Sequence, residues 1–202
     1  MATVFLVDDD PGVLKALSRL LHTKGYDVRA YTSPQEFLAQ HDATVCGCAV
    51  LDVAMPGLDG LALQQALTSV DAPRPVIFIT GKGDIPTSVR AMKAGAIDFL
   101  VKPVSDQDLL APLARAQEQD TKSRQIRAEL ASIQAKLTTL TPREREVLTH
   151  VVAGRLNKQI AGDLGTVEKT IKVHRSRVME KMGVRTVVDL VRLAEKAGIS
   201  RN

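Results

Sequence analysis

Tryptophan, cysteine and long hydrophobic runs are scarce or absent in this sequence. Its 202 residues include no tryptophan, four phenylalanines, two tyrosines and two cysteines, and 45% of them are hydrophobic. No stretch approaches the roughly 18 apolar residues of a membrane-spanning helix. The N-terminus has no basic segment followed by an apolar one, so we expect no secretion signal. The chain is long enough to bury a proper core and has room for two domains.

The two cysteines, Cys46 and Cys48, lie in one predicted strand, TVCGCAVLD. Strand alternation would point both side chains to the same face, too far apart for an ordinary disulfide. A lone C-x-C pair is weak support for a metal site, so we expect two buried core thiols. A reduced, cytoplasmic protein follows.

Charge is divided unevenly along the chain. Residues 1–104 contain 9 lysines and arginines and 11 aspartates and glutamates, whereas residues 142–202 contain 13 and 7. An acidic N-terminal part and a basic C-terminal part predict two functions, the second with a polyanion as partner.

The first half alternates short apolar runs with helical patterns. The apolar runs are TVFLV (3–7), CAVL (48–51), VIFIT (76–80) and FLV (99–101), and a further strand is expected at DVRAY (27–31). Helical patterns lie between them, for example over 13–25 and 86–96. Buried strands alternating with helices predict a doubly wound, five-stranded parallel sheet of the flavodoxin-like type, covered by helices on both faces.

Chemically active side chains follow four of these strands. They are Asp8, Asp9 and Asp10 after the first strand, then Asp52, Thr80 and Lys102 at the ends of three others. The three aspartates alone favour a solvated turn that precedes a helix. In parallel sheets, however, the ligand site lies beyond the carboxyl ends of the strands. The combination therefore predicts a site at this edge.

The residue types at this edge favour phosphoryl transfer. Asp8, Asp9 and Asp52 form a set of hard oxygen ligands that suits Mg²⁺, which would also neutralise their mutual repulsion. Lys102 adds a compact positive charge and Thr80 a hydroxyl donor, as catalysis by positioning and charge neutralisation requires. Asp52 is the candidate nucleophile, because a carboxylate can accept a phosphoryl group covalently.

Four motifs in order, LVDDD, LDVAMPGLDG, FITGKGD and AMKAGAIDFLVKP, resemble those of a bacterial response-regulator receiver domain. The resemblance covers residues 1–118. It implies Mg²⁺ or Mn²⁺ as cofactor and the following roles: Asp52 as phosphoacceptor, Asp8 and Asp9 as the acidic pair, the backbone carbonyl of Ala54 as a metal ligand, Thr80 as switch hydroxyl, Phe99 as aromatic switch residue and Lys102 as phosphate-contacting lysine. It also implies a cis Lys102-Pro103 bond and leaves Asp10 to cap the first helix.

Two positions near the candidate nucleophile are expected to affect the lifetime of the acyl phosphate. Ala54 stands where the family often has a larger polar residue, and Lys82 places a cation at the rim. We expect both to tune the access of water, although Lys82 fits a solvated loop lysine equally well.

A helical connector is predicted over residues 119–140. Ser105, followed by Asp106 and Asp108, is an N-terminal helix signal upstream of it. Apolar residues then recur at spacings of four and three: Ile126, Leu130, Ile133, Leu137 and Leu140. This a/d pattern fits a short coiled coil or packing against a neighbouring domain.

The basic end, residues 141–202, reads as short helices separated by glycines. Thr141 and Glu144 form a predicted capping box. Helices over 157–164 and 168–182, joined at Gly165, give a helix-turn-helix pattern. In the second helix the basic side chains gather largely away from the apolar ones. A solvated cationic face would explain this, but the net positive charge of the segment favours DNA.

This segment resembles a LuxR-type helix-turn-helix domain, and the whole chain resembles the NarL/FixJ class of response regulators, nearest the FixJ side. The resemblance implies DNA contacts by these residues: Lys172, Val173 and Ser176 in the major groove, and Lys158, Thr170, His174 and Arg177 on phosphates. Val167 departs from the family, which usually has a capping serine there, with Thr166 as the candidate substitute. The last helix carries an apolar stripe suited to core packing or to a DNA-bound dimer.

We therefore expect a non-enzymatic transcription regulator that binds double-stranded promoter DNA and is controlled by a partner histidine kinase. Phosphorylation would promote homodimerisation or release of the DNA-binding domain, and RNA polymerase is a further candidate partner; no membrane is involved. One alternative is a regulator that binds DNA constitutively. Another is an aspartate-nucleophile phosphatase of the haloacid dehalogenase type, which Asp8-x-Asp10 would suit. That motif usually continues to threonine or valine at Gly12, and the basic end would then be unexplained.

Overall fold

The structure is a computed structural model that describes residues 2–68, 73–81 and 83–199. Contacts between residues divide the chain into two compact units, Met1–Arg124 and Gln125–Asn202. Within the described residues, no helix is both long enough and apolar enough to cross a membrane.

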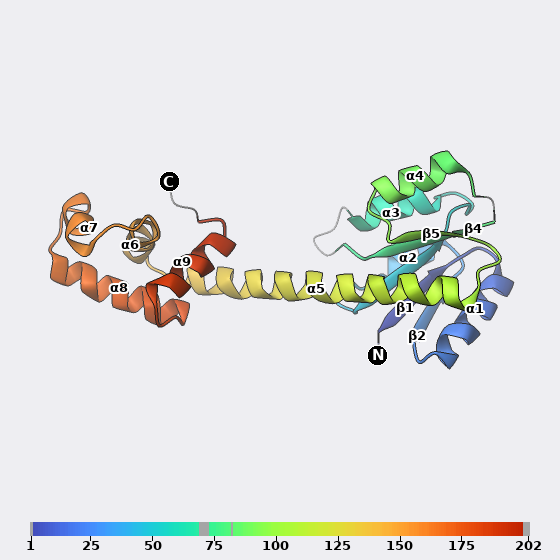
Figure 1. The fold of residues 1–202 in the computed structure, drawn as a ribbon, viewed down its shortest axis with the longest axis horizontal. Helices are drawn as coiled ribbons and strands as arrows, with labels where there is room; N and C mark the ends of the chain where they lie inside the picture. Colours follow the sequence, from blue (N-terminus) through green and yellow to red (C-terminus); the bar gives the residue numbers. More distant parts are fainter. Residues whose placement is uncertain (1, 69–72, 82, 200–202) are drawn as a thin grey trace. The chain divides into compact units, whose positions relative to one another are not determined.

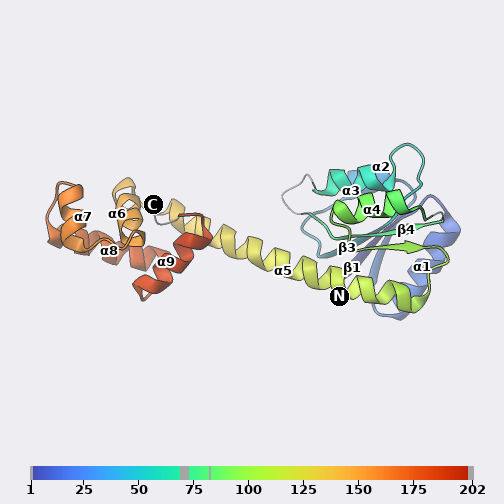
Figure 2. The same ribbon diagram turned by 45° about the horizontal axis from the view of Figure 1, so that its top comes forward.

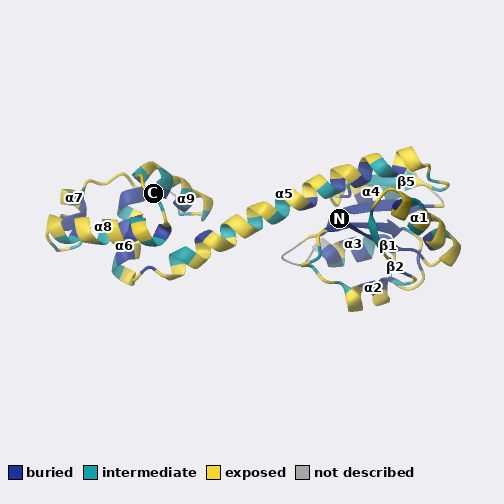
Figure 3. Ribbon diagram, turned by 90° about the horizontal axis from the view of Figure 1, so that it is seen from below, coloured by how far each residue is buried: buried dark blue, intermediate teal, exposed yellow. Residues whose placement is uncertain are grey.

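The first unit contains a five-stranded parallel sheet. Its strands are β1 (Thr3–Val7), β2 (Asp27–Tyr31), β3 (Gly47–Asp52), β4 (Val76–Thr80) and β5 (Asp98–Val101), arranged in the order β2-β1-β3-β4-β5 (Figure 1). Every residue of β1, β3 and β4 is buried, because these central strands are covered on both faces (Figure 3). The predicted flavodoxin-like sheet is confirmed, including the strand order typical of that fold.

Five helices accompany the sheet: α1 (Pro11–Thr23), α2 (Pro34–Gln40), α3 (Gly60–Thr68), α4 (Ile85–Lys93) and α5 (Asp106–Thr138). Helices α1 and α5 bury Leu17 and Leu113 against one face of the sheet. Helices α2, α3 and α4 cover the other face, where Phe37 and Leu63 lie in the same cluster as Phe5 (Figures 1 and 2). The alternation of β1 sends Phe5 to one core and Leu6 to the other, as the pleat requires.

One prediction from the strand pattern is wrong. Cys48 is buried in β3, but Cys46 is exposed, and both thiols are free. The strand begins only at Gly47, whose φ of 145° is accessible to glycine but strained for other residues. Cys46 therefore belongs to the preceding loop and does not follow the alternation of the strand.

The second unit is helical. The end of α5 is followed by α6 (Pro142–Val152), α7 (Asn157–Asp163), α8 (Glu168–Met182) and α9 (Val187–Lys196). Thr141 and Glu144 make both hydrogen bonds of the predicted capping box at the start of α6. Helix α8 is followed by the C-cap Gly183, which adopts the left-handed conformation that favours glycine.

The apolar stripe of the connector divides into two parts. Helix α5 runs without a break to Thr138 and passes through Pro112. Ile133 and Leu140 are buried in the core of the second unit, and Leu137 packs against that core. Ile126, one heptad before Ile133, is 59% exposed. Packing against a neighbouring domain therefore accounts for the C-terminal part of the stripe.

Candidate functional site

Two buried carboxylates and a lysine meet at the carboxyl edge of the sheet. Asp8 follows β1 and Asp52 ends β3, and they are only 1% and 4% exposed. The Lys102 Nζ atom lies 2.6 Å from the Asp8 Oδ2 atom and 2.8 Å from the Asp52 Oδ1 atom. Because β1 and β3 are adjacent parallel strands, their ends bring the two acids together, and the segment after β5 supplies the lysine.

Backbone N–H groups hold the other oxygen of each carboxylate. The Asp10 N–H donates to the Asp8 Oδ1 atom at 3.0 Å, and the Ala54 N–H donates to the Asp52 Oδ2 atom at 2.7 Å. Each carboxylate thus has one oxygen on the backbone and the other on Lys102. This arrangement fixes the orientation of both side chains before any ligand binds.

Burial and pairing act in opposite directions on these groups. Burial raises the pKa of Asp8, although the hydrogen bonds from Lys102 and the Asp10 backbone oppose this effect. Burial alone would lower the pKa of Lys102, but the hydrogen bonds to Asp52 and Asp8 outweigh it and raise that pKa. Lys102 therefore remains an ammonium at neutral pH, and an unphosphorylated site contains a cation already in contact with the candidate nucleophile.

The donor set fits a hydrated Mg²⁺ ion. Among the described residues, no group of three or more His, Cys, Asp or Glu side chains is arranged to hold a metal by itself. Asp9 and Ala54 are exposed beside the two buried acids. Mg²⁺ keeps several waters and needs only one or two carboxylates, so Asp8 and Asp52, with Asp9 and the Ala54 carbonyl at the rim, meet its requirements.

The predicted switch residues lie on the neighbouring strands. Thr80 ends β4 and is 2% exposed. Phe99, in β5, is half-buried, with its ring centroid 6.2 Å from that of Phe78. The Lys102-Pro103 bond is cis, as the resemblance implies. Lys82 lies outside the described residues.

The side chain of Asp10 takes no part in this constellation. Its side chain is the N-cap of α1 and accepts a hydrogen bond from the Gly12 N–H at 2.7 Å, as predicted. A phosphatase that uses an Asp-x-Asp pair would need this carboxylate free to act in the site. Its capping role therefore argues against that alternative.

The helix-turn-helix exposes most of the predicted DNA-contacting residues. Exposed side chains on α7 and α8 include Lys158, Lys172, Val173, Ser176 and Arg177, while Thr170 and His174 are half-buried. The Nδ1 atom of His174 is buried without a hydrogen-bond partner. The buried apolar residues of α8, Ile171, Val178 and Met182, lie on the opposite side of the helix, so its basic face is exposed within the second unit.

Two contacts that position α8 were not predicted. Arg175 donates from Nη1 to the Asn157 Oδ1 atom at 2.9 Å, which ties α8 to the start of α7. The Lys181 Nζ atom lies 2.6 Å from the Glu144 Oε2 atom. The capping-box pattern predicts the local role of Glu144, but no local pattern in the sequence identifies Lys181, 37 residues away, as its partner.

Glu144 is a buried carboxylate with several donors. Its hydrogen bonds with Lys181 and the Thr141 backbone lower its pKa to about 2. The Val167 N-cap of α8, by contrast, has no side-chain hydrogen bond, so Thr166 does not replace the missing serine. The start of α8 thus lacks the capping that the start of α6 has.

Family comparisons agree with both halves of the molecule. Residues 4–114 match the response regulator receiver domain, and residues 138–194 match the luxR family of bacterial regulatory proteins. The chain is 45% identical over 201 residues to nodulation protein W of Bradyrhizobium diazoefficiens, covering 100% of this chain and 88% of that protein. It is 39% identical over 196 residues to the transcriptional regulatory protein FixJ of the same organism, covering 97% and 96%.

Solved structures give the same result. The response regulator StyR is similar with a TM-score of 0.88 and 44% identity, over 96% of this chain and 98% of that one. Full-length FixJ from B. japonicum is similar with a TM-score of 0.59 and 38% identity, over 98% of each chain. The protein therefore belongs to the two-component response regulators of the NarL/FixJ class, which join a receiver domain to a LuxR-type DNA-binding domain.

Proposed function

We propose that Asp52 is the phosphoacceptor and that its phosphorylation by a partner histidine kinase controls DNA binding. One observation carries this proposal: Asp52 is buried at the end of β3, held by the Ala54 N–H and in contact with Lys102. A nucleophile that is already oriented beside a cation has little reorganisation left to undergo.

The transfer exchanges one bond for another. An oxygen of the Asp52 carboxylate attacks the phosphorus of a phosphohistidine on the kinase. The phosphorus–nitrogen bond breaks, its electron pair stays on the imidazole nitrogen, and an acyl phosphate forms on Asp52. Lys102 moves from the carboxylate to a phosphoryl oxygen, and Asp8, Asp9, Asp52 and the Ala54 carbonyl would hold Mg²⁺. The bound ion supplies charge neutralisation for the transferred group.

The switch then acts through Thr80 and Phe99. We propose that their rearrangement on phosphorylation changes the surface formed by α4 and β5. Four apolar side chains are already exposed on this surface: Ile85, Val89, Met92 and Val101. An exposed apolar patch of this kind suits a protein interface, so phosphorylated receivers would pair through it as a homodimer. The paired DNA-binding domains would then contact a two-fold symmetric DNA site.

The test compares DNA binding with and without phosphorylation. Sites are selected from a random duplex pool at fixed salt, with and without Mg²⁺ and a small-molecule phosphodonor, for the wild type and Asp52→Asn. Asp59→Asn is the matched control, because Asp59 is exposed and only caps α3, a role that asparagine also fills.

We expect a two-fold symmetric site to be enriched with the donor for the wild type and for Asp59→Asn, but not for Asp52→Asn. Equal enrichment with and without the donor would instead support constitutive DNA binding. Phosphoryl incorporation into Asp52→Asn equal to that of the wild type would refute the assignment of Asp52.

A further inference from the structure

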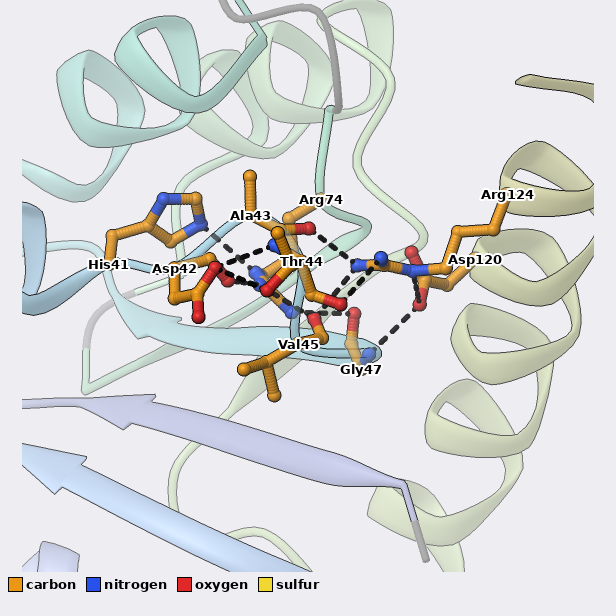
Figure 4. A network of polar contacts seen from close by, with 9 residues as sticks. All are labelled: His41, Asp42, Ala43, Thr44, Val45, Gly47, Arg74, Asp120 and Arg124. Carbon is orange, nitrogen blue, oxygen red and sulfur yellow. Dashed lines mark hydrogen bonds and ion pairs between the residues drawn. The ribbon is translucent and has the colours of Figure 1, made fainter. Parts of the chain in front are cut away.

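A buried polar network joins α5 to the loop that precedes β3, at the opposite end of the sheet from Asp52. This loop, residues 41–46, presents a series of backbone carbonyls that need hydrogen-bond donors. Two arginines supply them, Arg74 from the segment before β4 and Arg124 from α5 (Figure 4). All of these residues belong to the first unit.

Arg74 is buried against the end of the sheet, where it packs on Phe5 of β1. Its guanidinium carbon lies 4.0 Å from the centroid of the Phe5 ring, and the residue is 4% exposed. It donates to the Asp42, Val45 and Gly47 carbonyls and to the His41 Nε2 atom. These hydrogen bonds go to the loop and to the start of β3, and Arg74 interacts with Asp120 of α5 through charge alone.

Asp120 and Arg124 make the connection to the helix. The Asp120 Oδ2 atom accepts hydrogen bonds from the Gly47 N–H at 2.9 Å and from the Arg124 Nε atom at 2.8 Å. Arg124 also donates to the Thr44, Ala43 and Val45 carbonyls, at 3.0, 3.0 and 2.8 Å. The two residues lie one helical turn apart. Asp120 thus binds the N–H of the first residue of β3, and Arg124 binds the carbonyls of the loop before it.

These contacts extend beyond the apolar packing of the helix. The last residue of α5 in the receiver core is Ala116. Arg124 lies eight residues later, about 12 Å further along the helix. Burying a carboxylate such as Asp120, which is 2% exposed, is unfavourable without partners, and helix formation alone does not require it. By comparison, the Glu118–Lys122 pair on the same helix is more than 60% exposed on both sides.

We propose that Asp120 and Arg124 form a latch that fastens α5 to the receiver for two turns beyond its apolar contact. Helix α5 is thereby held to the receiver as far as Arg124. Resting on the proposed function, we further propose that this latch is what lets the phosphorylation state of the receiver influence DNA binding. Opening the latch would uncouple the two activities while leaving each of them intact.

Two measurements on the full-length protein test the latch in Arg124→Ala, with Arg124→Lys as a milder variant that keeps the charge but loses the planar fork. Lys122→Ala is the matched control, since it removes another long cation from the same helix. The first measurement is amide hydrogen exchange over residues 117–128. We expect exchange to accelerate about tenfold or more in Arg124→Ala, less in Arg124→Lys, and not measurably in Lys122→Ala. Equal exchange in Arg124→Ala and the wild type would refute the latch.

The second measurement is DNA affinity with and without the phosphodonor, together with phosphoryl incorporation. Asp52 lies at the far end of β3, about 17 Å from Gly47, so we expect incorporation to be unchanged. The donor-induced gain in affinity should fall about threefold or more in Arg124→Ala and remain at the wild-type value in Lys122→Ala.

The outcomes separate the two proposals. Accelerated exchange with an undiminished donor effect would overturn the coupling role and leave the latch as a structural fastening only. A wild type that shows no donor effect would refute the proposed function, and the coupling role with it. Hydrogen exchange would still decide whether the latch exists.

Discussion

Ile126 and Ile133 provide a direct test of what the connector stripe does. They are the same residue type, one heptad apart on the same face of α5, yet Ile126 is 59% exposed and Ile133 is 2% exposed. Ile133 belongs to the core of the second unit, in one cluster with Val147 and Leu190. Truncating each isoleucine to alanine therefore makes an identical chemical change in two different environments.

We expect Ile133→Ala to lower the free energy of unfolding of the second unit by about 2–5 kcal/mol, the cost of removing a buried aliphatic side chain and leaving a cavity. This is a large part of the 5–15 kcal/mol that stabilises a typical domain. Ile126→Ala should change the free energy by no more than about 0.5 kcal/mol, because an exposed side chain loses little on truncation.

The distribution of aromatic residues makes the assay selective. Both tyrosines, Tyr26 and Tyr31, lie in the first unit, and the chain has no tryptophan. Tyrosine absorption or fluorescence in urea therefore reports on the receiver, whereas far-UV circular dichroism also follows the helical second unit. Ile133→Ala should move the circular dichroism transition to lower urea and leave the tyrosine transition in place.

Equal destabilisation by the two substitutions would refute this reasoning. That result would mean that the whole stripe is buried in solution, as in a coiled coil between two copies of the chain. A dependence of the Ile126→Ala effect on protein concentration would then identify the coiled coil directly.

Three further predictions concern single positions. A Cβ atom at Gly60 would lie 2.3 Å from the Asp52 carbonyl oxygen, whereas one at Gly81 would meet nothing within 4 Å. Gly60→Ala should therefore destabilise the receiver by about 1–3 kcal/mol in urea titrations followed by tyrosine signal, and the same loss in Gly81→Ala would contradict this cause. Val167→Ser should stabilise the second unit by about 1 kcal/mol by restoring a cap, measured by circular dichroism in urea; no gain would show that the start of α8 does not limit stability. The pKa of Glu144 lies at about 2, below its ordinary 4.5, so the folded state holds the proton more weakly than the unfolded state. The contribution of ionised Glu144 to the free energy of unfolding is fully present above pH 4.5 and is lost as the pH falls toward 2. Glu144→Gln should consequently cost about 1.5–3 kcal/mol at pH 7 and less at each lower pH in this window, and a cost that does not vary with pH would contradict the ionic role.

Local patterns in the sequence predicted several elements directly. The buried strands are continuous apolar runs, and parallel strands necessarily end at one edge, so the meeting of Asp8, Asp52 and Lys102 followed from the strand ends alone. Capping by Thr141 was equally predictable, since an N-cap bonds to backbone groups two or three residues away. The cap at Asp10 was implied by the resemblance and has the same local geometry. These features depend on neighbours along the chain or on a rule of sheet geometry.

Other features were decided only by tertiary structure. The sequence by itself predicted the parallel sheet, the meeting of acidic and basic side chains at its carboxyl edge, the helical connector and the basic helix-turn-helix. The structure decided that Cys46 lies outside its strand, that Ile133 is buried while Ile126 is exposed, and that Arg124 reaches a carbonyl 80 residues away. The physical reason is that periodicity along the chain specifies which face of an element is apolar, but not which surface will cover it. That assignment, like the partners of buried charges such as Asp120, depends on how distant segments come together.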